Sequence, residues 1–269
     1  REVYNRPYPP LGFYGFAEHE LGNGDVFGLY WPFGNEHRDP VVIETSHDDW
    51  TLNPKFSSID AFLLKASKVD EFEWVDEPLL TEDQLSPSAC LREAKSCISK
   101  NDYETAVGLL DVCLKVLPEF RAAIIPRCAQ YRRSGDSDNA IRTALRAIIS
   151  PPSFGGDLAS LVRWLASLNE CPSDLQEDPL WKNRRELTMR FGGQKQNDDY
   201  IILRNAIEQY IMQGKNLEAV LLMQTYGELM VRETISFKER YGFIISDYLA
   251  WQRRMTKNLG FSREIRMES

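Results

Sequence analysis

The segment LGNGDVFGLYWPFGNEHRDPVVIETSHDDW, residues 21–50, decides the N-terminal fold because its pattern is that of strands and turns. Two runs rich in β-branched and aromatic residues, DVFGLYW (25–31) and PVVIET (40–45), are bounded by Gly, Asn and Pro, as strands are. The sequence GNG at 22–24 signals one turn, and HDDW at 47–50 signals another that leads into a further short strand. We therefore predict strands joined by tight turns.

The residues on either side extend this unit. LGFYGF (11–16) predicts one more strand, and SSIDAFLLKAS (57–67) predicts a helix. Ser57 is the expected N-cap, because Asp60 follows three residues later in the spacing of a capping box. We predict an α+β unit over residues 1–82, a small antiparallel sheet followed by one helix. The buried stripe expected on that helix is Ile59, Phe62, Leu63 and Ala66.

Aromatic residues fall in both alternation phases of the predicted strands, so both faces of the sheet are expected to be at least partly buried. One helix covers only one face. The second face then needs another cover, either the helical remainder of the chain or a partner protein. The aromatic residues concerned are Phe13, Tyr14, Phe16, Phe27, Tyr30, Trp31 and Phe33.

An acidic connector at 70–83 leads into a helical pattern that occurs twice, first over 86–119 and then over 121–154. Small residues that recur 34 positions apart would let two helices approach closely, and a proline stops the second helix. The pattern resembles the tetratricopeptide repeat, although the bulky aromatic at the fourth place of that family is missing from both copies. We predict an all-α array of tetratricopeptide-like helical hairpins over 83–269. The residues that recur are Ala94 and Cys128, Asp102 and Asp136, Ala106 and Ala140, Leu114 and Ile148, and Pro118 and Pro152.

The pattern loosens after residue 155. Helices are predicted over 157–169 and, with an Asp cap and Pro at the first helical position, over 178–193. A further hairpin is predicted over 198–230, and a last helix over 235–259. The apolar seam of the last helix predicts lengthwise packing inside the chain, which we favour over a dimer contact. Its members are Phe237, Tyr241, Ile244, Tyr248, Trp251 and Met255.

Composition limits the class of protein. Hydrophobic residues at 43% and charged residues at 27% are typical of a soluble globular protein. No run approaches the roughly 20 apolar residues of a membrane span, so no membrane association is expected. Five cysteines, an odd number without C-x-x-C spacing, predict free thiols and neither a zinc site nor a redox pair. This indicates a reducing, cytoplasmic location.

Charge is distributed unevenly along the chain. Positions 1–85 hold 17 acidic and 6 basic side chains, a balance of −11, whereas positions 86–269 hold 23 and 26, a balance of +3. An acidic surface repels phosphates, which excludes nucleic acid as the partner of the N-terminal part. It favours capture of a basic protein. The alternative is that the acidic surface only keeps the protein in solution.

Signatures of catalysis are weak. The histidines, His19, His37 and His47, lie in the acidic part, but none stands in a metal-ligand motif such as H-E-x-x-H. GNGDVFG lacks the lysine and the following helix that a phosphate-binding loop requires. Short basic clusters such as QYRRSG (130–135) are typical of solvated helix faces. We therefore predict no enzyme, no cofactor and no metal.

The residues 21–63 resemble the SUKH superfamily, the Smi/Knr-like domains. The matching parts follow in the family's order: Gly24-Asp25, the aromatic strand 27–31, the P-[IV]-V-x strand 40–43, the H-D-x-W turn 47–50 and the capped helix 57–63. The usual helical N-terminal part is absent or very short, since only REVYNRPYPP precedes the first strand. In bacteria such domains are mostly immunity proteins that neutralise a toxin of the same strain, often a nuclease; in eukaryotes they are regulatory scaffolds.

Two functions follow from these observations. The resemblance and the charge together imply an immunity protein that binds a cognate toxin, of basic character, delivered by contact or by a type VI system. The alternative is a non-enzymatic scaffold or adaptor that holds peptides on its helical repeats, whose concave side is an equally reasonable binding surface. The oligomeric state and the identity of the toxin are left open. The partner-binding residues we predict are Glu36, His37, Asp39, Asp48, Asp49 and Trp50.

Overall fold

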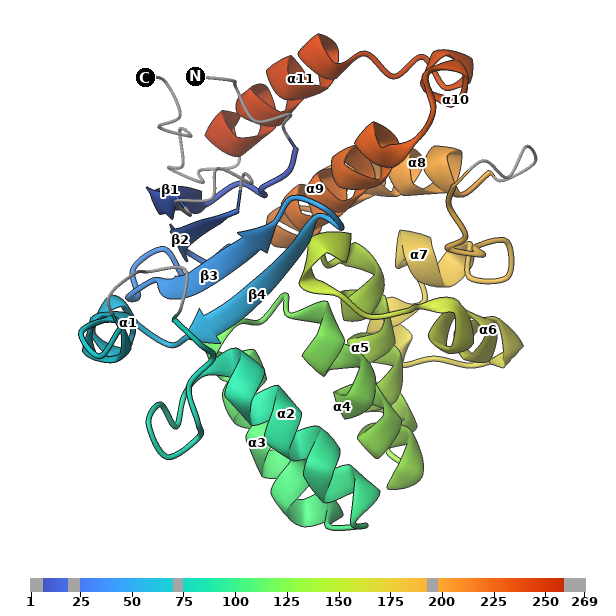
Figure 1. Cartoon of the computed structure of the whole chain (residues 1–269). Coiled ribbons are helices and arrows are strands. Elements are labelled where there is room, and N and C mark those ends of the chain that lie inside the picture. Colours follow the sequence, from blue (N-terminus) through green and yellow to red (C-terminus); the bar gives the residue numbers. More distant parts are fainter. Residues whose placement is uncertain (1–6, 19–24, 70–74, 193–197, 259–269) are drawn as a thin grey trace.

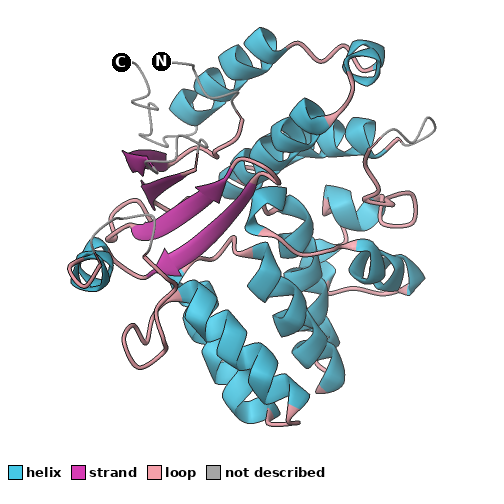
Figure 2. Ribbon diagram, viewed as in Figure 1, coloured by secondary structure: helices cyan, strands magenta, loops and turns pink. Residues whose placement is uncertain are grey.

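The computed structural model describes residues 7–18, 25–69, 75–192 and 198–258. A small antiparallel sheet comes first along the chain and helices follow, so the predicted α+β layout is confirmed (Figures 1 and 2). The sheet has the order β1-β2-β3-β4, in which each strand pairs antiparallel with the next. The expected GNG turn at 22–24 and His19 lie outside the described residues. The strands are β1 (Phe13–Glu18), β2 (Val26–Tyr30), β3 (Val41–Ser46) and β4 (Thr51–Phe56).

The helices occupy most of the remaining chain. Over the described ranges, no helix combines the length and the apolar content that crossing a membrane requires. The helices are α1 (Ile59–Ala66), α2 (Pro87–Ser99), α3 (Tyr103–Val116), α4 (Arg121–Arg133), α5 (Ser137–Ile149), α6 (Ala159–Ser167), α7 (Pro179–Lys182), α8 (Asp199–Met212), α9 (Asn216–Arg232), α10 (Ile235–Arg240) and α11 (Ile245–Asn258), with 3-10 turns η2 (Pro152–Phe154) and η3 (Ser173–Leu175).

Both faces of the sheet are at least partly buried, as the two aromatic phases predicted, although Tyr14 and Phe16 on β1 are 54% and 38% exposed. On one face the fully buried rings of Phe27 and Phe56 lie 5.1 and 5.5 Å from the ring of Phe62 on α1. On the other face Tyr30 and Ile43 share a core with residues of α2 and α3. The second cover is therefore the helical part of the chain itself.

The start of α1 differs from the prediction by one residue. Ser58, not Ser57, is the N-cap, because its hydroxyl accepts the Ala61 N–H at 3.2 Å. Ser57 instead donates its N–H and its hydroxyl to the carboxylate of Asp83, both at 2.7 Å. The predicted stripe is partly wrong as well, since Leu63 is 51% exposed. A carboxylate distant in sequence has recruited the first serine, which the local pattern does not reveal.

The repeated pattern corresponds to two helical hairpins, α2/α3 and α4/α5 (Figure 1). The small residues that recur 34 positions apart are almost completely buried, as close helix approach requires. Asp102 and Asp136, which occupy equivalent places in the two copies, cap α3 and α5 by accepting N–H groups three residues ahead. The hairpins are thus observed, and the resemblance to tetratricopeptide repeats stays a prediction. The small residues are Ala94, Ala106, Cys128 and Ala140.

The helix predicted over 178–193 is wrong beyond its first turn. Asp178 caps α7 as expected, accepting the N–H groups of Leu180 and Trp181, but α7 ends at Lys182. Further on, Thr188 donates both its N–H and its hydroxyl to Asp199 at the start of α8. These tertiary hydrogen bonds replace the helical ones that local propensity favoured.

The predicted last helix is two helices, α10 and α11. The break lies around Gly242, whose φ of +60° is readily adopted only by glycine. Tyr248 of α11 packs so closely on α9 that a Cβ at Gly227 would lie 2.2 Å from its ring. Most of the predicted seam is used inside the chain in this way, whereas Ile244 is 56% exposed because it lies before α11.

Candidate functional site

The predicted partner-binding residues lie in two groups at opposite ends of β3. Asp48, Asp49 and Trp50 belong to the connection between β3 and β4, residues 47–50, which we call the acidic turn. Glu36, His37 and Asp39 belong to the β2–β3 loop, residues 31–40. A strand rises about 3.3 Å per residue, so the length of β3 separates the two groups by roughly 16 Å or more. They do not form one continuous cluster.

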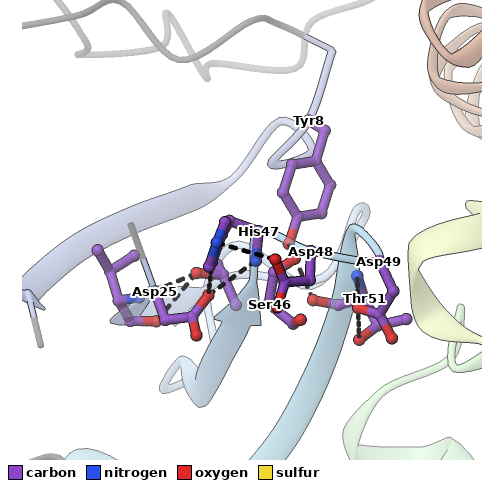
Figure 3. A network of polar contacts seen from close by, with 9 residues as sticks. Tyr8, Asp25, Ser46, His47, Asp48, Asp49 and Thr51 are labelled. Atoms are coloured by element: carbon purple, nitrogen blue, oxygen red, sulfur yellow. Dashed lines mark hydrogen bonds and ion pairs between the residues drawn. The ribbon is translucent and has the colours of Figure 1, made fainter. Parts of the chain in front are cut away.

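The acidic turn is organised around His47 (Figure 3). Its backbone N–H donates to Asp25 Oδ1 at 2.7 Å, and its ring Nδ1 lies 2.9 Å from the same oxygen. Nε2 lies 3.0 Å from Asp48 Oδ1. The pKa of His47 is raised mainly by the hydrogen bond with Asp25, which outweighs the opposing effect of desolvation, and further by the charges of Asp48 and Asp25.

Asp49 is held in place by the first residue of β4. Its Oδ1 accepts the hydroxyl of Thr51 at 2.7 Å and the Thr51 N–H at 3.2 Å. Hydrogen bonds from Thr51, and then from Ser46, lower the pKa of Asp49, so its carboxylate is charged at neutral pH. Tyr8 joins the two strands beneath, because its hydroxyl lies 2.9 Å from the carbonyl oxygen of Ser46 and 2.8 Å from that of Thr51.

Trp50 occupies a backbone conformation that needs support. Its φ of +57° is left-handed, a region that costs a non-glycine residue about 1–3 kcal/mol. Its ring stacks on Tyr8, with centroids 5.5 Å apart and planes 16° from parallel. From α9, Arg232 donates to the carbonyl oxygen of Trp50 at 2.8 Å and places its guanidinium 5.5 Å from the centroid of the indole. Trp50 is thus half-buried, a support as well as a surface residue.

The β2–β3 loop is built differently. Glu36 accepts the Gly34 N–H at 3.0 Å, and Arg38 donates to the carbonyl oxygen of Lys115 on α3 at 3.1 Å. His37 and Asp39 are exposed. At its start the loop is anchored by Phe33, whose side chain is buried and whose N–H donates to Glu119 Oε1 at 3.2 Å. The charged residues that follow are held by the loop's own turns and by the contact of Arg38 with α3.

A buried group of polar residues under the acidic turn was missed by the sequence analysis. Glu228 of α9 is fully buried and accepts hydrogen bonds from Arg232 at 2.7 Å and from Ser153 at 3.0 Å. Burial raises its pKa to about 7, and lowers the pKa of the neighbouring Arg121 to about 10. A Glu and an Arg four residues apart resemble an ordinary exposed helix pair, so the sequence carries no signal for this group.

The site presents negative charge on a hydrogen-bonded turn. Among the described residues, no group of three or more His, Cys, Asp or Glu side chains could hold a metal ion. The structure brings His47 together with Asp25, Asp48 and a hydrogen-bonded turn, while it places His37 in the other loop. Asp48 lies beside the His47 ring, and Asp49 accepts hydrogen bonds from Thr51. The Asp48 side chain is nevertheless 86% exposed.

Comparison with known proteins gives two matches to family models and one similar protein. Residues 1–75 match the model of the YfbP N-terminal domain, and residues 190–266 match that of the YfbP C-terminal domain. The chain is 34% identical over 251 residues to a protein of Escherichia coli (strain K12) named "Uncharacterized protein YfbP", an alignment that covers 93% of this chain and 88% of that protein. No solved structure matches. The acidic turn lies in the first matched region, and its supports Glu228 and Arg232 lie in the second.

Proposed function

The chain belongs to the YfbP family, and we propose that it is a protein-binding member which captures a basic protein with its acidic turn. The single observation that carries this proposal is the display of the two turn carboxylates. Asp48 is 86% exposed, and Asp49 is exposed yet fixed to Thr51. Both stand on a backbone held by Asp25 and Arg232. A binding surface that is already ordered loses little conformational entropy when its partner docks.

Charge supports a basic partner. The N-terminal part, positions 1–85, carries a balance of −11, from 17 acidic and 6 basic side chains. Complementary potentials steer encounter and raise association rates, most strongly at low salt. Because Asp49 has a lowered pKa, its negative charge persists as the solution becomes moderately acidic. The acidic turn therefore offers a persistent anionic contact at the tip of a hairpin.

The arrangement also favours the acidic turn over the helical repeats as the contact surface. β4 packs against α2 and η2, and the sheet shares a core with α2 and α3. Part of the hairpin surface is thus occupied by the chain's own sheet. A peptide held by the repeats would have to use the surface that remains.

The resemblance of residues 21–63 to SUKH domains supports a specific partner class. The parts of that resemblance at 27–31, 40–43, 47–50 and 57–63 correspond to β2, β3, the acidic turn and α1. We therefore propose that the captured protein is a toxin, that the chain acts as its immunity protein in the cytoplasm, and that neutralisation needs no chemistry by this chain.

The test has two linked measurements. The tagged chain is used to capture proteins from its native strain at low salt, and the captured protein is identified by mass spectrometry. The gene of that protein is then expressed with and without this chain, and growth is measured. We expect a basic protein whose expression stops growth, and restoration of growth by this chain.

The matched variants are Asp48→Asn with Asp49→Asn, which remove two charges while keeping a hydrogen-bond acceptor for Thr51. Glu36→Gln with Asp39→Asn remove the same charge from the β2–β3 loop. We expect the turn variant to lose capture and rescue, and the loop variant to keep both. A captured protein with no effect on growth, or rescue that survives loss of the turn charges, would count against the proposal.

A further inference from the structure

Helix α9 reaches the acidic turn from the far end of the chain, and Arg232 is the residue that makes the contact (Figure 1). We infer that Arg232 is the positioning residue of the acidic turn, and that its contacts with Trp50 depend on the charge of Glu228. The importance of this for binding rests on the proposed function, whereas the conformational link does not. The C-terminal matched region would thereby set the binding competence of the N-terminal one.

The geometry of Arg232 is that of a bridge. One nitrogen, Nη2, lies 2.8 Å from the carbonyl oxygen of Trp50 and 2.7 Å from Glu228 Oε1, so its two hydrogens can serve both. The guanidinium also lies 5.5 Å from the centre of the Trp50 ring. Glu228 thus orients Arg232, and Arg232 holds both the carbonyl and the ring of Trp50.

Trp50 is a suitable point of control because its conformation is strained. A left-handed non-glycine residue persists only where its surroundings impose it. Tyr8 stacks on the ring, and Arg232 of α9 contacts both the ring and the carbonyl oxygen. If Arg232 loses its contacts with Trp50, the backbone at Trp50 can relax, and the neighbouring Asp48 and Asp49 lose their fixed placement.

Glu228 is surrounded by polar or charged groups of several other elements. Because it is fully buried, its ionisation changes the field at all of them. Lower pH protonates Glu228 in the range around neutrality and removes the charge that attracts Arg232. The facing groups are Arg232 on α9, Arg121 on α4, Ser153 on η2, Tyr8 of the N-terminal segment and Tyr248 on α11.

A purely structural role of Arg232 makes a different prediction. If Arg232 only glued the sheet to α9, the stability of the whole chain and the order of the acidic turn would change together. In the positioning role they move in opposite directions with pH. Protonation of Glu228 relieves the cost of burying a charge and stabilises the fold, while it loosens Arg232 and therefore the acidic turn.

The experiment measures hydrogen exchange of the His47 and Thr51 amides in the full-length chain by NMR, corrected for intrinsic rates, between pH 5.5 and 8.5. These two N–H groups donate to Asp25 and Asp49 and report the order of the acidic turn. We expect Arg232→Gln to speed their exchange at pH 8 by about tenfold, the size expected for loss of a charge-assisted hydrogen bond. Wild-type exchange should accelerate as pH falls through neutrality.

Two further variants make the result specific. Glu228→Gln should abolish the pH step and give fast exchange in the acidic turn even at pH 8, while thermal unfolding shows a fold at least as stable as wild type. Arg232→Lys should restore part of the protection, since an ammonium can donate to the Trp50 carbonyl. Arg142→Gln is the matched control, because it removes an exposed ion pair between α5 and Asp174, away from the turn.

The outcomes separate the two proposals. Unchanged exchange in Arg232→Gln, or a pH step that survives in Glu228→Gln, overturns the positioning role of Arg232. If Arg232→Gln speeds exchange while Asp48→Asn with Asp49→Asn still captures the partner, the positioning role stands and the proposed function fails. Faster exchange with capture lost in both Arg232→Gln and the turn variant supports both.

Discussion

The two ends of β3 carry loops that look alike in sequence and differ in structure. Each contains a histidine and two acidic residues. The acidic turn is fixed by hydrogen bonds with the residue before β2, with β4 and with α9, a helix far along the chain. The β2–β3 loop is anchored at its start by the buried Phe33, and its charged residues are held by the loop's own turns and by the contact of Arg38 with α3. The acidic side chains of the two loops are thus held by different contacts, and only the β2–β3 loop also carries a basic residue, Arg38.

Composition alone therefore does not identify a binding surface, because two loops of similar composition can differ in the contacts that support them. A charge on an unsupported loop must be ordered before it contributes, and ordering each side chain costs about 0.5–1.5 kcal/mol. In the acidic turn this ordering is already supplied by contacts within the folded chain. Each prediction below tests whether the two loops differ as their supports do.

The largest expected effect concerns Glu228, the buried residue under the acidic turn. Its pKa is raised from 4.5 to about 7, so the folded chain binds the proton more tightly than the unfolded chain does. Stability is therefore lost as pH rises from about 4.5 to 7, and the loss amounts to about 3 kcal/mol above pH 7. Glu228→Gln should remove this slope and raise the free energy of unfolding at pH 8 by up to about that amount. Urea unfolding at pH 5 and pH 8 measures it.

A comparison with the other loop sharpens this prediction. Asp39→Asn should shift the free energy of unfolding by less than about 0.5 kcal/mol at either pH, as exposed substitutions do. If Glu228→Gln proved destabilising by several kcal/mol at pH 8, the ionised pair with Arg232 would be a net stabiliser. The raised pKa of Glu228 would then be wrong.

Trp50 gives the next largest effect. Trp50→Ala removes the stack on Tyr8 and the contact with the Arg232 guanidinium, which together should cost about 2 kcal/mol of unfolding free energy. Trp50→Gly loses the same contacts but relieves the left-handed backbone, so it should be less destabilising than Ala by about 1 kcal/mol. Chemical denaturation of both variants measures the difference. If Gly were no better than Ala, the strain at residue 50 would not be real.

The charges of the acidic turn follow in size. Against the basic protein identified by capture, Asp48→Asn with Asp49→Asn should slow association by about tenfold at low salt and leave dissociation less affected. The same charge removed from the β2–β3 loop, by Glu36→Gln with Asp39→Asn, should change association by a smaller factor. Stopped-flow mixing at two salt concentrations checks both. Equal effects from the two pairs would show that total charge matters and that order of the loop does not.

Much of the fold could be predicted because the deciding signals are local. Strand alternation placed the four strands of the sheet to within a few residues, and the repeated helical pattern placed the four helices α2 to α5. The errors lie where distant residues compete with local preference. Ser57 bonds to Asp83 and not to its own helix, and Thr188 bonds to Asp199 where a helix was expected. No nearby pattern encodes such partners.

The candidate site could be predicted only in part, for the same reason. The HDDW pattern predicted a turn with exposed carboxylates at 47–50, and the structure has that turn. Its supports are contributed by α9, and the distance in sequence between Trp50 and Arg232 hides their contact. The burial of Glu228 depends on how the hairpins, α9 and the sheet meet, which is a property of the assembled fold.

The smallest expected effect distinguishes the contributions of the two neighbours of His47. The hydrogen bond with Asp25 is the largest cause of the raised pKa of His47, so Asp25→Asn should lower that pKa, and Asp48→Asn should lower it less. The sign for stability follows, because a histidine with a raised folded pKa stabilises below its ordinary pKa of 6.5 and loses this contribution as pH rises through the folded value. Titration of the His47 ring protons by NMR measures both variants. A larger drop of the pKa in Asp48→Asn would mean that the charge of the exposed Asp48, and not the hydrogen bond with Asp25, sets the protonation of His47. The acidic turn would then resemble the β2–β3 loop more than its geometry indicates.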